Sequence, residues 1–283
     1  MVDLEGIFRK LDRAVEHLDA LNETAERFFE DSDDEIYALH GETNSQRTKH
    51  LFRVELLQPL PLIEWGLIVG DAVHCLRSAL DQLAYSFCGD PDGNTAFPIS
   101  RTRKEWVTKS PAMLWGIPDP VTAVIDRAQP YHCGEGDKAE AHPLAVLNTL
   151  WNTDKHKFIP VVALVPASAE WNITGTQGMA SYKEVRLKAG RVFEDRAVVA
   201  DMSFVPDDSG LEPQVEMHGN ISFNVAFGKT GVPKSISRKQ VIPAVAALGE
   251  RVEAVLRDLN TALGGTVAEQ LAALQRRDPR TKP

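Results

Sequence analysis

The sequence predicts an α+β protein, in which an N-terminal helical bundle with a β-hairpin packs with a C-terminal antiparallel sheet and a closing helix. Apolar residues recur every three or four positions in residues 4–29, 61–88 and 237–264, which is typical of amphipathic helices. Apolar and polar residues alternate within 36–57 and again within 182–227, which indicates strands. A chain of 283 residues is long enough for one large domain or two modest ones.

Composition and charge limit the classes of function. The chain is 43% hydrophobic and 25% charged, which is ordinary for a globular protein. Its formal net charge of -9 disfavours a broad, non-specific hold on nucleic acid, because such binding needs a field of positive charge. Short basic clusters at Arg101, Arg103 and Lys104, and at Lys155 and Lys157, leave room for a local phosphate or RNA contact.

Cysteine use and the N-terminal residues predict a cytoplasmic protein without a membrane partner. Cys75, Cys88 and Cys133 form no CxxC pair, and an odd number of cysteines leaves one unpaired in an oxidising compartment. The first residues are charged every few positions, unlike a signal peptide or a lipidation motif. The apolar run 60–69 is too short to span a membrane.

The chain opens with a long helix, residues 4–29, which we expect to pack against a central helix. Its apolar positions are Leu4, Ile7, Leu11, Ala14, Leu18, Leu21, Ala25 and Phe28. An acidic break then leads to a hairpin at 36–57, where Asn44 and Ser45 suit the turn. Pro61 begins the next helix, since proline is tolerated in a first helical turn.

Residues 61–88 are predicted to form the central helix. At about 100° per residue, its apolar side chains gather on one side: Trp65, Val69, Ala72, Leu76, Ala79, Leu80, Leu83 and Phe87. Its polar and reactive side chains share the other: Asp71, His74, Cys75, Arg77, Ser78, Asp81 and Gln82. Before Gly70 the stretch is apolar nearly all round, so its first turns are expected to be buried on every side.

The middle of the chain predicts short helices joined by loops. Helices are expected around Trp106 and at 120–128, followed by an exposed, mobile loop at 129–141 that is rich in glycine and charge. Pro143 can open another helix, and a strand at 158–165 follows it.

The last third predicts an antiparallel sheet and a closing helix. Ser237 and Gln240 fit a capping box for this helix, and Pro243 either kinks the helix or moves its start. The expected strands are 182–187, 198–205, 215–217 and 221–227. The predicted organisation is a helical region with the hairpin at 1–157, a sheet with the closing helix at 158–275 that shares its core, and a tail at 276–283.

One set of segments resembles a known family. GDAVHCLRSALDQLAY at 70–85 is followed by FPI, AQPY and PLAVLNTLWNTDKHKFI. This pattern resembles a family of uncharacterised bacterial and phage proteins, whose hallmark is an HxLRSALDxLA helix followed by an NxDKH segment. The resemblance covers residues 36–165 and implies no particular activity.

A weaker similarity is to HEPN domains, which are helical bundles that often act as ribonucleases. Their active site has an arginine followed, after four to six residues, by a histidine. The similarity implies that Arg77 is this arginine, but Gln82 stands five residues later where a histidine is needed.

The polar side of the central helix is the first candidate site. Asp71, His74, Arg77 and Asp81 are spaced by three, three and four residues, so they line one helix face. In a functional interpretation His74 is an acid or base oriented by Asp71, and Arg77 binds an anion. In a structural interpretation Arg77 and Asp81 form an ion pair that ties the helix to its neighbours.

A second candidate lies at 154–156. If His156 approaches His74, the two histidines with Asp71 and Asp154 would suit zinc, iron or manganese. Otherwise Asp154 caps or turns the chain, and Lys155 and His156 are ordinary surface groups. No cofactor is expected, and a divalent metal enters only through this set.

Two classes of function therefore remain. One is a binding or scaffold protein that recognises a ligand, a partner or a second copy of the chain through the polar face of the central helix. The other is a HEPN-like or metal-assisted nuclease of defence or phage type, with His74, Arg77, Asp81, Asp154 and His156 as candidates. The acidity of the chain and the glutamine at position 82 favour the binding protein. Cys75 and Ser78 lie near His74 on the same helix, but a nucleophile pair needs two side chains that face each other across a cleft, with a third group to orient them, and a free cysteine is usually buried.

Overall fold

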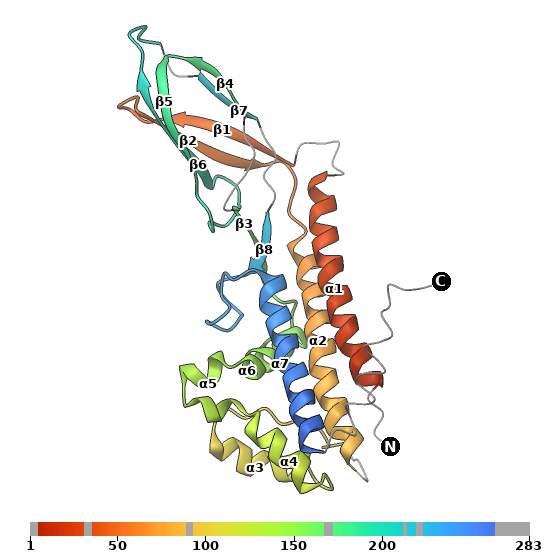
Figure 1. Ribbon diagram of the computed structural model, residues 1–283. Coiled ribbons are helices and arrows are strands. Elements are labelled where there is room, and N and C mark those ends of the chain that lie inside the picture. The colour runs from red at the N-terminus through yellow and green to blue at the C-terminus, as the bar shows by residue number, and fades with distance from the viewer. Residues whose placement is uncertain are drawn as a thin grey trace.

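The structure is a computed structural model that describes residues 5–30, 36–88, 93–166, 172–211, 214–218 and 223–263. It confirms the α+β class. Helices occupy one end of the molecule and most of the strands the other (Figure 1). Three long helices run alongside one another at the helical end: α1 (Glu5–Glu30), α2 (Leu62–Phe87) and α7 (Val241–Ala262).

Helix α1 forms where the three-four spacing predicts it. Its apolar positions face α2, and charged residues cover its outer side. The buried positions are Ile7, Leu11, Ala14, Leu18, Leu21 and Ala25.

The predicted hairpin is also present, as β1 (Tyr37–Thr43) and β2 (Lys49–Leu56). Asn44 fixes the turn, since its side-chain Oδ1 accepts hydrogen bonds from the N–H groups of Thr48 and Lys49, both at 2.9 Å.

The hairpin joins two C-terminal strands, β5 (Met179–Leu187) and β6 (Val198–Pro206), in one antiparallel sheet of order β1-β2-β6-β5. An ion-pair cluster reinforces this junction. The buried carboxylate of Asp201 in β6 accepts from Lys49 of β2 at 3.1 Å and from Lys188 just after β5. Long-range pairing of this kind is what ties the first part of the chain to the last.

The other C-terminal strands form two separate two-stranded sheets. β3 (Val161–Leu164) pairs with β8 (Asn224–Phe227), and β4 (Asn172–Gln177) pairs with β7 (Gln214–His218). Strand β4 was not predicted, and residues 221–222 of the predicted strand 221–227 lie outside the described residues.

The prediction of a loop at 129–141 is wrong, although most of these residues are exposed as predicted. These residues form a 3-10 helix, a short α-helix and buried contacts, and Gln129 and Pro130 are both buried. The helices of this region are α3 (Arg103–Met113), α4 (Asp119–Arg127), η1 (Pro130–Cys133), α5 (Asp137–Ala141) and α6 (Pro143–Asp154).

The predicted capping box at the start of α7 is wrong, because Pro243 moves the start of the helix. The N-cap residue is Gln240, which makes no side-chain capping bond. The Ser237 hydroxyl instead donates to the carbonyl of Gly228 at 3.4 Å. The predicted tail, 276–283, lies outside the described residues.

One buried apolar cluster connects both ends of the molecule. It includes side chains of α1, α2, α4, α6 and α7 and of strands β2, β3, β6 and β8. Helix α2 lies at its centre, since α1, α6, α7 and β3 all contact it. Among the described helices, none has an apolar stretch that is long enough to cross a membrane.

Candidate functional site

Arg77 in the middle of α2 is only 4% exposed. Its Nη2 donates to the carbonyl oxygen of Phe97 at 2.8 Å and lies 3.0 Å from Oδ1 of Asp81, one turn further along the helix. The same Oδ1 accepts the backbone N–H of Phe97 at 3.0 Å. An i,i+4 pair on α2 therefore holds both backbone polar groups of Phe97, and we call these three residues the Phe97 clamp.

The electrostatics of the clamp are those of a structural ion pair. Burial lowers the pKa of Arg77, and it raises the pKa of Asp81 despite the opposing effect of the guanidinium. For both side chains the effect of burial on the pKa is larger than the effect of the partner's charge. The hydrogen bonds to Phe97 compensate for the water that the two charged groups lose on burial. The Nε and Nη1 atoms of Arg77 are buried and have no hydrogen-bond partner among the described residues. The structural interpretation of Arg77 and Asp81 is favoured, because the guanidinium offers almost no surface to a phosphate.

The indole ring of Trp151, on α6, interacts with two cations. The Cζ atom of Arg77 lies 5.2 Å from the ring centroid, and the Nζ atom of Lys155 lies 3.1 Å from it. Lys155 is an exposed residue, and its ammonium group lies directly over this ring.

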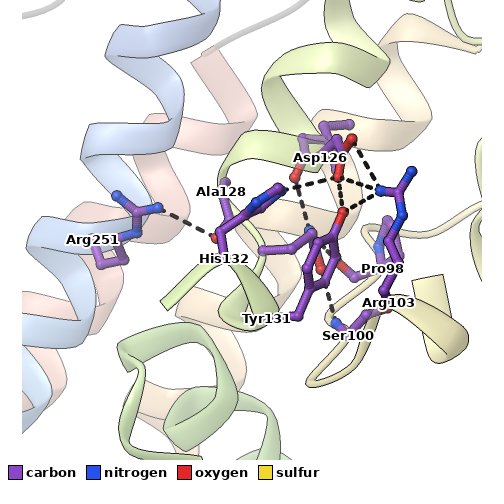
Figure 2. A network of polar contacts seen from close by, with 10 residues as sticks. Pro98, Ser100, Arg103, Asp126, Ala128, Tyr131, His132 and Arg251 are labelled. Carbon is purple, nitrogen blue, oxygen red and sulfur yellow. Dashed lines mark hydrogen bonds and ion pairs between the residues drawn. The ribbon is translucent and has the colours of Figure 1, made fainter. Parts of the chain in front are cut away.

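A second clamp holds the chain directly after Phe97. The buried Gln129 side chain donates through Nε2 to the carbonyls of Pro98 and Ile125, both at 2.9 Å, and accepts the N–H of Ser100 at 2.8 Å. Figure 2 shows Pro98 and Ser100 beside this network. Residues 97–100 are therefore fixed from both sides, by α2 and by the end of α4.

Arg103, from the predicted basic cluster, is occupied by its neighbours. Its Nη1 donates to the Tyr131 hydroxyl at 2.7 Å and lies 3.4 Å from Oδ1 of Asp126 (Figure 2). The same carboxylate oxygen accepts a hydrogen bond from the Tyr131 hydroxyl and lies 3.3 Å from Nε2 of His132. Nearby, Arg251 of α7 donates to the carbonyl of Ala128 at 3.3 Å. These contacts join α3, α4 and α7 and leave Arg103 with its charge already paired.

The two sequence motifs do meet in space. A Cβ atom placed on Gly70 of α2 would lie 2.0 Å from Oδ1 of Asp154, so the end of α6 packs directly on the helix at this glycine. Burial raises the pKa of Asp154, the nearby Asp71 carboxylate raises it further, and His74 opposes the change. The polar face of α2 therefore meets the end of α6 at Asp71, His74 and Asp154.

His156 does not join them. It is exposed, its backbone N–H bonds to the carbonyl of Thr153 at 3.1 Å, and among the described residues the His74 ring is hydrogen-bonded to Ser78 and not to His156. Within the part of the chain that the structure describes, no three His, Cys, Asp or Glu side chains are grouped to hold a metal ion. The candidate metal set of Asp71, His74, Asp154 and His156 is therefore not assembled.

The nucleophile candidates are equally unsupported. Cys75 is buried, and burial raises the pKa of its thiol, which disfavours the reactive thiolate. The Ser78 hydroxyl lies 3.2 Å from Nε2 of His74, but no described carboxylate hydrogen-bonds to that histidine to orient it.

What α2 does expose is a continuous strip of side chains. The expectation that its first turns are buried on every side is wrong, since Ile63 is 58% and Leu67 54% exposed. At 100° per residue these two share one face with five later residues, and we call the seven the α2 stripe: Ile63, Leu67, Asp71, His74, Ser78, Asp81 and Tyr85.

Further exposed apolar residues lie near both ends of α2. The exposed Phe158 passes beside Gly66, where its ring would lie 3.5 Å from an added Cβ. At the other end, Tyr85 is 54% exposed, and the carbonyl of the 75% exposed Trp115 accepts a hydrogen bond from Cys88. The stripe is thus apolar at both ends and polar in the middle.

Sequence reasoning missed the partners of the clamps and the apolar ends of the stripe. The exposure of Ile63 and Leu67 had a signal, since both stand in helical register with His74 on the polar side. The roles of Phe97 and Gln129 had none, because backbone hydrogen bonds leave no pattern in a sequence. Comparisons of this chain with protein-family models, with curated proteins and with solved structures found no match.

Proposed function

We propose that this protein is a non-enzymatic binding protein that docks a helical segment of another protein along the α2 stripe. The observation that carries the proposal is the exposure of Ile63, Leu67 and Tyr85 on one helix face, with the exposed Phe158 beside the first turns of α2. Large apolar side chains that gather on a surface mark interaction sites. From Ile63 to Tyr85 the stripe is about 33 Å long, which suits a partner helix of about 22 residues.

The middle of the stripe selects the charge of the partner. Asp71 and Asp154 lie close enough for each carboxylate to affect the other, and neither has an ion-pair partner among the described residues. A lysine or arginine at the centre of the docked helix would relieve this repulsion. The expected partner segment is apolar at both ends and basic in the middle.

A second copy of the chain fits this chemistry poorly. In a two-fold pairing of the stripe centred on His74, the carboxylates of Asp71 and Asp154 from both copies would gather at the axis. Like charges placed together across an interface cost binding energy. We therefore favour a different protein over a homodimer.

The test uses a synthetic helical peptide of about 22 residues, with leucines at its ends and lysines at its centre. Its binding is measured by fluorescence anisotropy. Leu67→Asp should weaken binding at least about tenfold, because it buries a charge in an apolar contact. Val15→Asp, at an equally exposed apolar position on α1, is the matched control and should leave binding unchanged.

Charge reversal tests the central part of the stripe. Asp71→Lys should weaken the binding of the lysine peptide and strengthen the binding of a matched peptide with glutamates at its centre. Equal binding of both peptides to the unaltered protein, or equal effects of Leu67→Asp and Val15→Asp, would refute the proposal.

A further inference from the structure

Two adjoining pockets lie beside the starts of α6 and α7, away from the α2 stripe. One has a volume of about 380 Å³ and the other about 520 Å³, and both are lined by Ala141 and Ser235. Each volume falls in the range of small-molecule sites, roughly 300–1,000 Å³. None of their lining residues belongs to the α2 stripe or to the Phe97 clamp.

The larger pocket is mainly apolar. Its walls come from the first turns of α6 and α7 and from the segment that leads into α7, and they include Val146, Ile236, Ala244, Ala247 and Leu248. Such a surface accommodates an alkyl or aromatic group of a ligand.

The smaller pocket carries charges of both signs. Arg101 and Lys234 supply two cations, and Asp137 and Glu140 supply two carboxylates. Arg101 is oriented by a hydrogen bond from Nη2 to the Thr149 hydroxyl.

Ser235, which both pockets share, adds an unused hydrogen-bonding group. Its hydroxyl oxygen is buried and has no hydrogen-bond partner among the described residues. A buried hydroxyl without a partner costs free energy, and a bound polar group next to it would recover that cost.

We propose that these pockets bind one small amphiphile with a zwitterionic head, the apolar part in the larger pocket and the head in the smaller one. The head needs both signs of charge because the smaller pocket presents two cations and two carboxylates. A purely anionic head would face Asp137 and Glu140, and a purely cationic head would face Arg101 and Lys234. Each of these two heads would place like charges next to each other, whereas a zwitterionic head can place each of its charges beside a side chain of opposite charge.

Titration calorimetry with three probes of equal chain length tests the head-group preference. The probes are octylphosphocholine, octyl sulfate and octyltrimethylammonium, all used below the concentrations at which they form micelles. Octylphosphocholine should bind at least about tenfold more tightly than either singly charged probe. A fourth titration with phenylalanine, a zwitterion with an apolar side chain, distinguishes an amino-acid ligand from a lipid head group.

Two neighbouring alanines on α7 provide a matched pair of variants. Ala247 lines the larger pocket, and Ala246 is exposed and does not. Ala247→Trp should fill the pocket and abolish binding, whereas Ala246→Trp should leave it unchanged. Circular dichroism of both variants controls for folding.

Charge variants test the smaller pocket in the same way. Lys234→Met and Glu140→Gln should each weaken the binding of octylphosphocholine about tenfold. Lys229→Met, which changes an exposed lysine outside both pockets, is the control and should leave this binding unchanged. Failure of both zwitterions to bind at millimolar concentration, a preference for a singly charged head, or equal binding by Ala247→Trp and Ala246→Trp would overturn the proposal. These outcomes are independent of peptide docking on the α2 stripe.

Discussion

Replacing Arg77 with methionine is the most direct test of the Phe97 clamp, because methionine keeps much of the side chain's length and removes its charge. The change leaves Asp81 without its cation and removes the donor to the Phe97 carbonyl. Removing one partner of a buried ion pair costs about 3–5 kcal/mol. Asp81 is only partly buried, so we expect the lower end, a loss of about 3 kcal/mol in the free energy of unfolding.

Urea denaturation followed by circular dichroism measures this loss. The matched control is Arg13→Met, which breaks an exposed i,i+3 pair with Glu16 on α1 and should cost less than about 1 kcal/mol. A loss for Arg77→Met as small as that of the control would show that the guanidinium is not a structural element, and Arg77 would again be a candidate for anion binding.

The pH dependence gives the same prediction a second readout. Burial already raises the folded-state pKa of Asp81 above its ordinary value, and removing Arg77 takes away the opposing effect. In the variant, the folded protein therefore takes up a proton before the unfolded chain does. The loss of stability should be largest above the raised pKa and should shrink as pH falls through it. A loss that stays constant down to the ordinary pKa of aspartate would contradict this account.

Three further predictions concern other parts of the structure. Gly66→Ala should destabilise the protein by about 2 kcal/mol in urea denaturation, because the added Cβ would lie 2.4 Å from the backbone carbonyl oxygen of Ile159. Gly249→Ala is the control and should be neutral or stabilising, because its Cβ would make only an ordinary contact with Leu76 at 3.6 Å. His142 is buried, and burial lowers its pKa to about 4, so below pH 6.5 the unfolded chain takes up a proton that the folded protein does not. The free energy of unfolding should therefore fall by about 3 kcal/mol as the pH drops from 6.5 toward 4. His142→Asn should keep the helix cap and remove this pH dependence. Purified protein should not cleave single-stranded RNA without metal, and Gln82→His should not create cleavage. Activity that is lost on His74→Ala with the fold intact would contradict this last prediction.

The long helices were predictable because each one shows its burial as a local pattern. The three-four spacing located α1 and α2 to within a residue or two, and the alternation around Asn44 located the hairpin. The start of α7 was mistaken by a few residues, because a capping box and Pro243 predict different starts and the proline prevailed.

The arrangement of strands was less predictable, because pairing depends on contacts between distant residues. Nothing near Phe52 in the sequence indicates that it pairs with Ala200 in β6. The loop error at 129–141 has a similar cause. Glycine and charge predict exposure, yet Gln129 is buried because three backbone groups satisfy its amide.

The structure brings some of the candidate site residues together and uses others to hold the fold. Asp71, His74 and Asp154 do come together, whereas Arg77 faces inward and, with the partly exposed Asp81, binds the backbone of Phe97. Helical spacing alone does not distinguish these outcomes, because a polar residue at the edge of an amphipathic face packs inward when a neighbouring segment covers it.

The segments that contain the HxLRSALDxLA and NxDKH patterns, with FPI and AQPY between them, are thus largely the segments that hold α2 to its surroundings. Arg77 binds the FPI segment, Gln129 of AQPY binds the same segment from the other side, and Trp151 and Asp154 pack the NTDKH helix against α2. A pattern of this kind describes how the chain folds, so chemistry should not be assigned from it. We propose that other molecules are bound instead by the exposed side chains of the α2 stripe and by the residues around the two adjoining pockets.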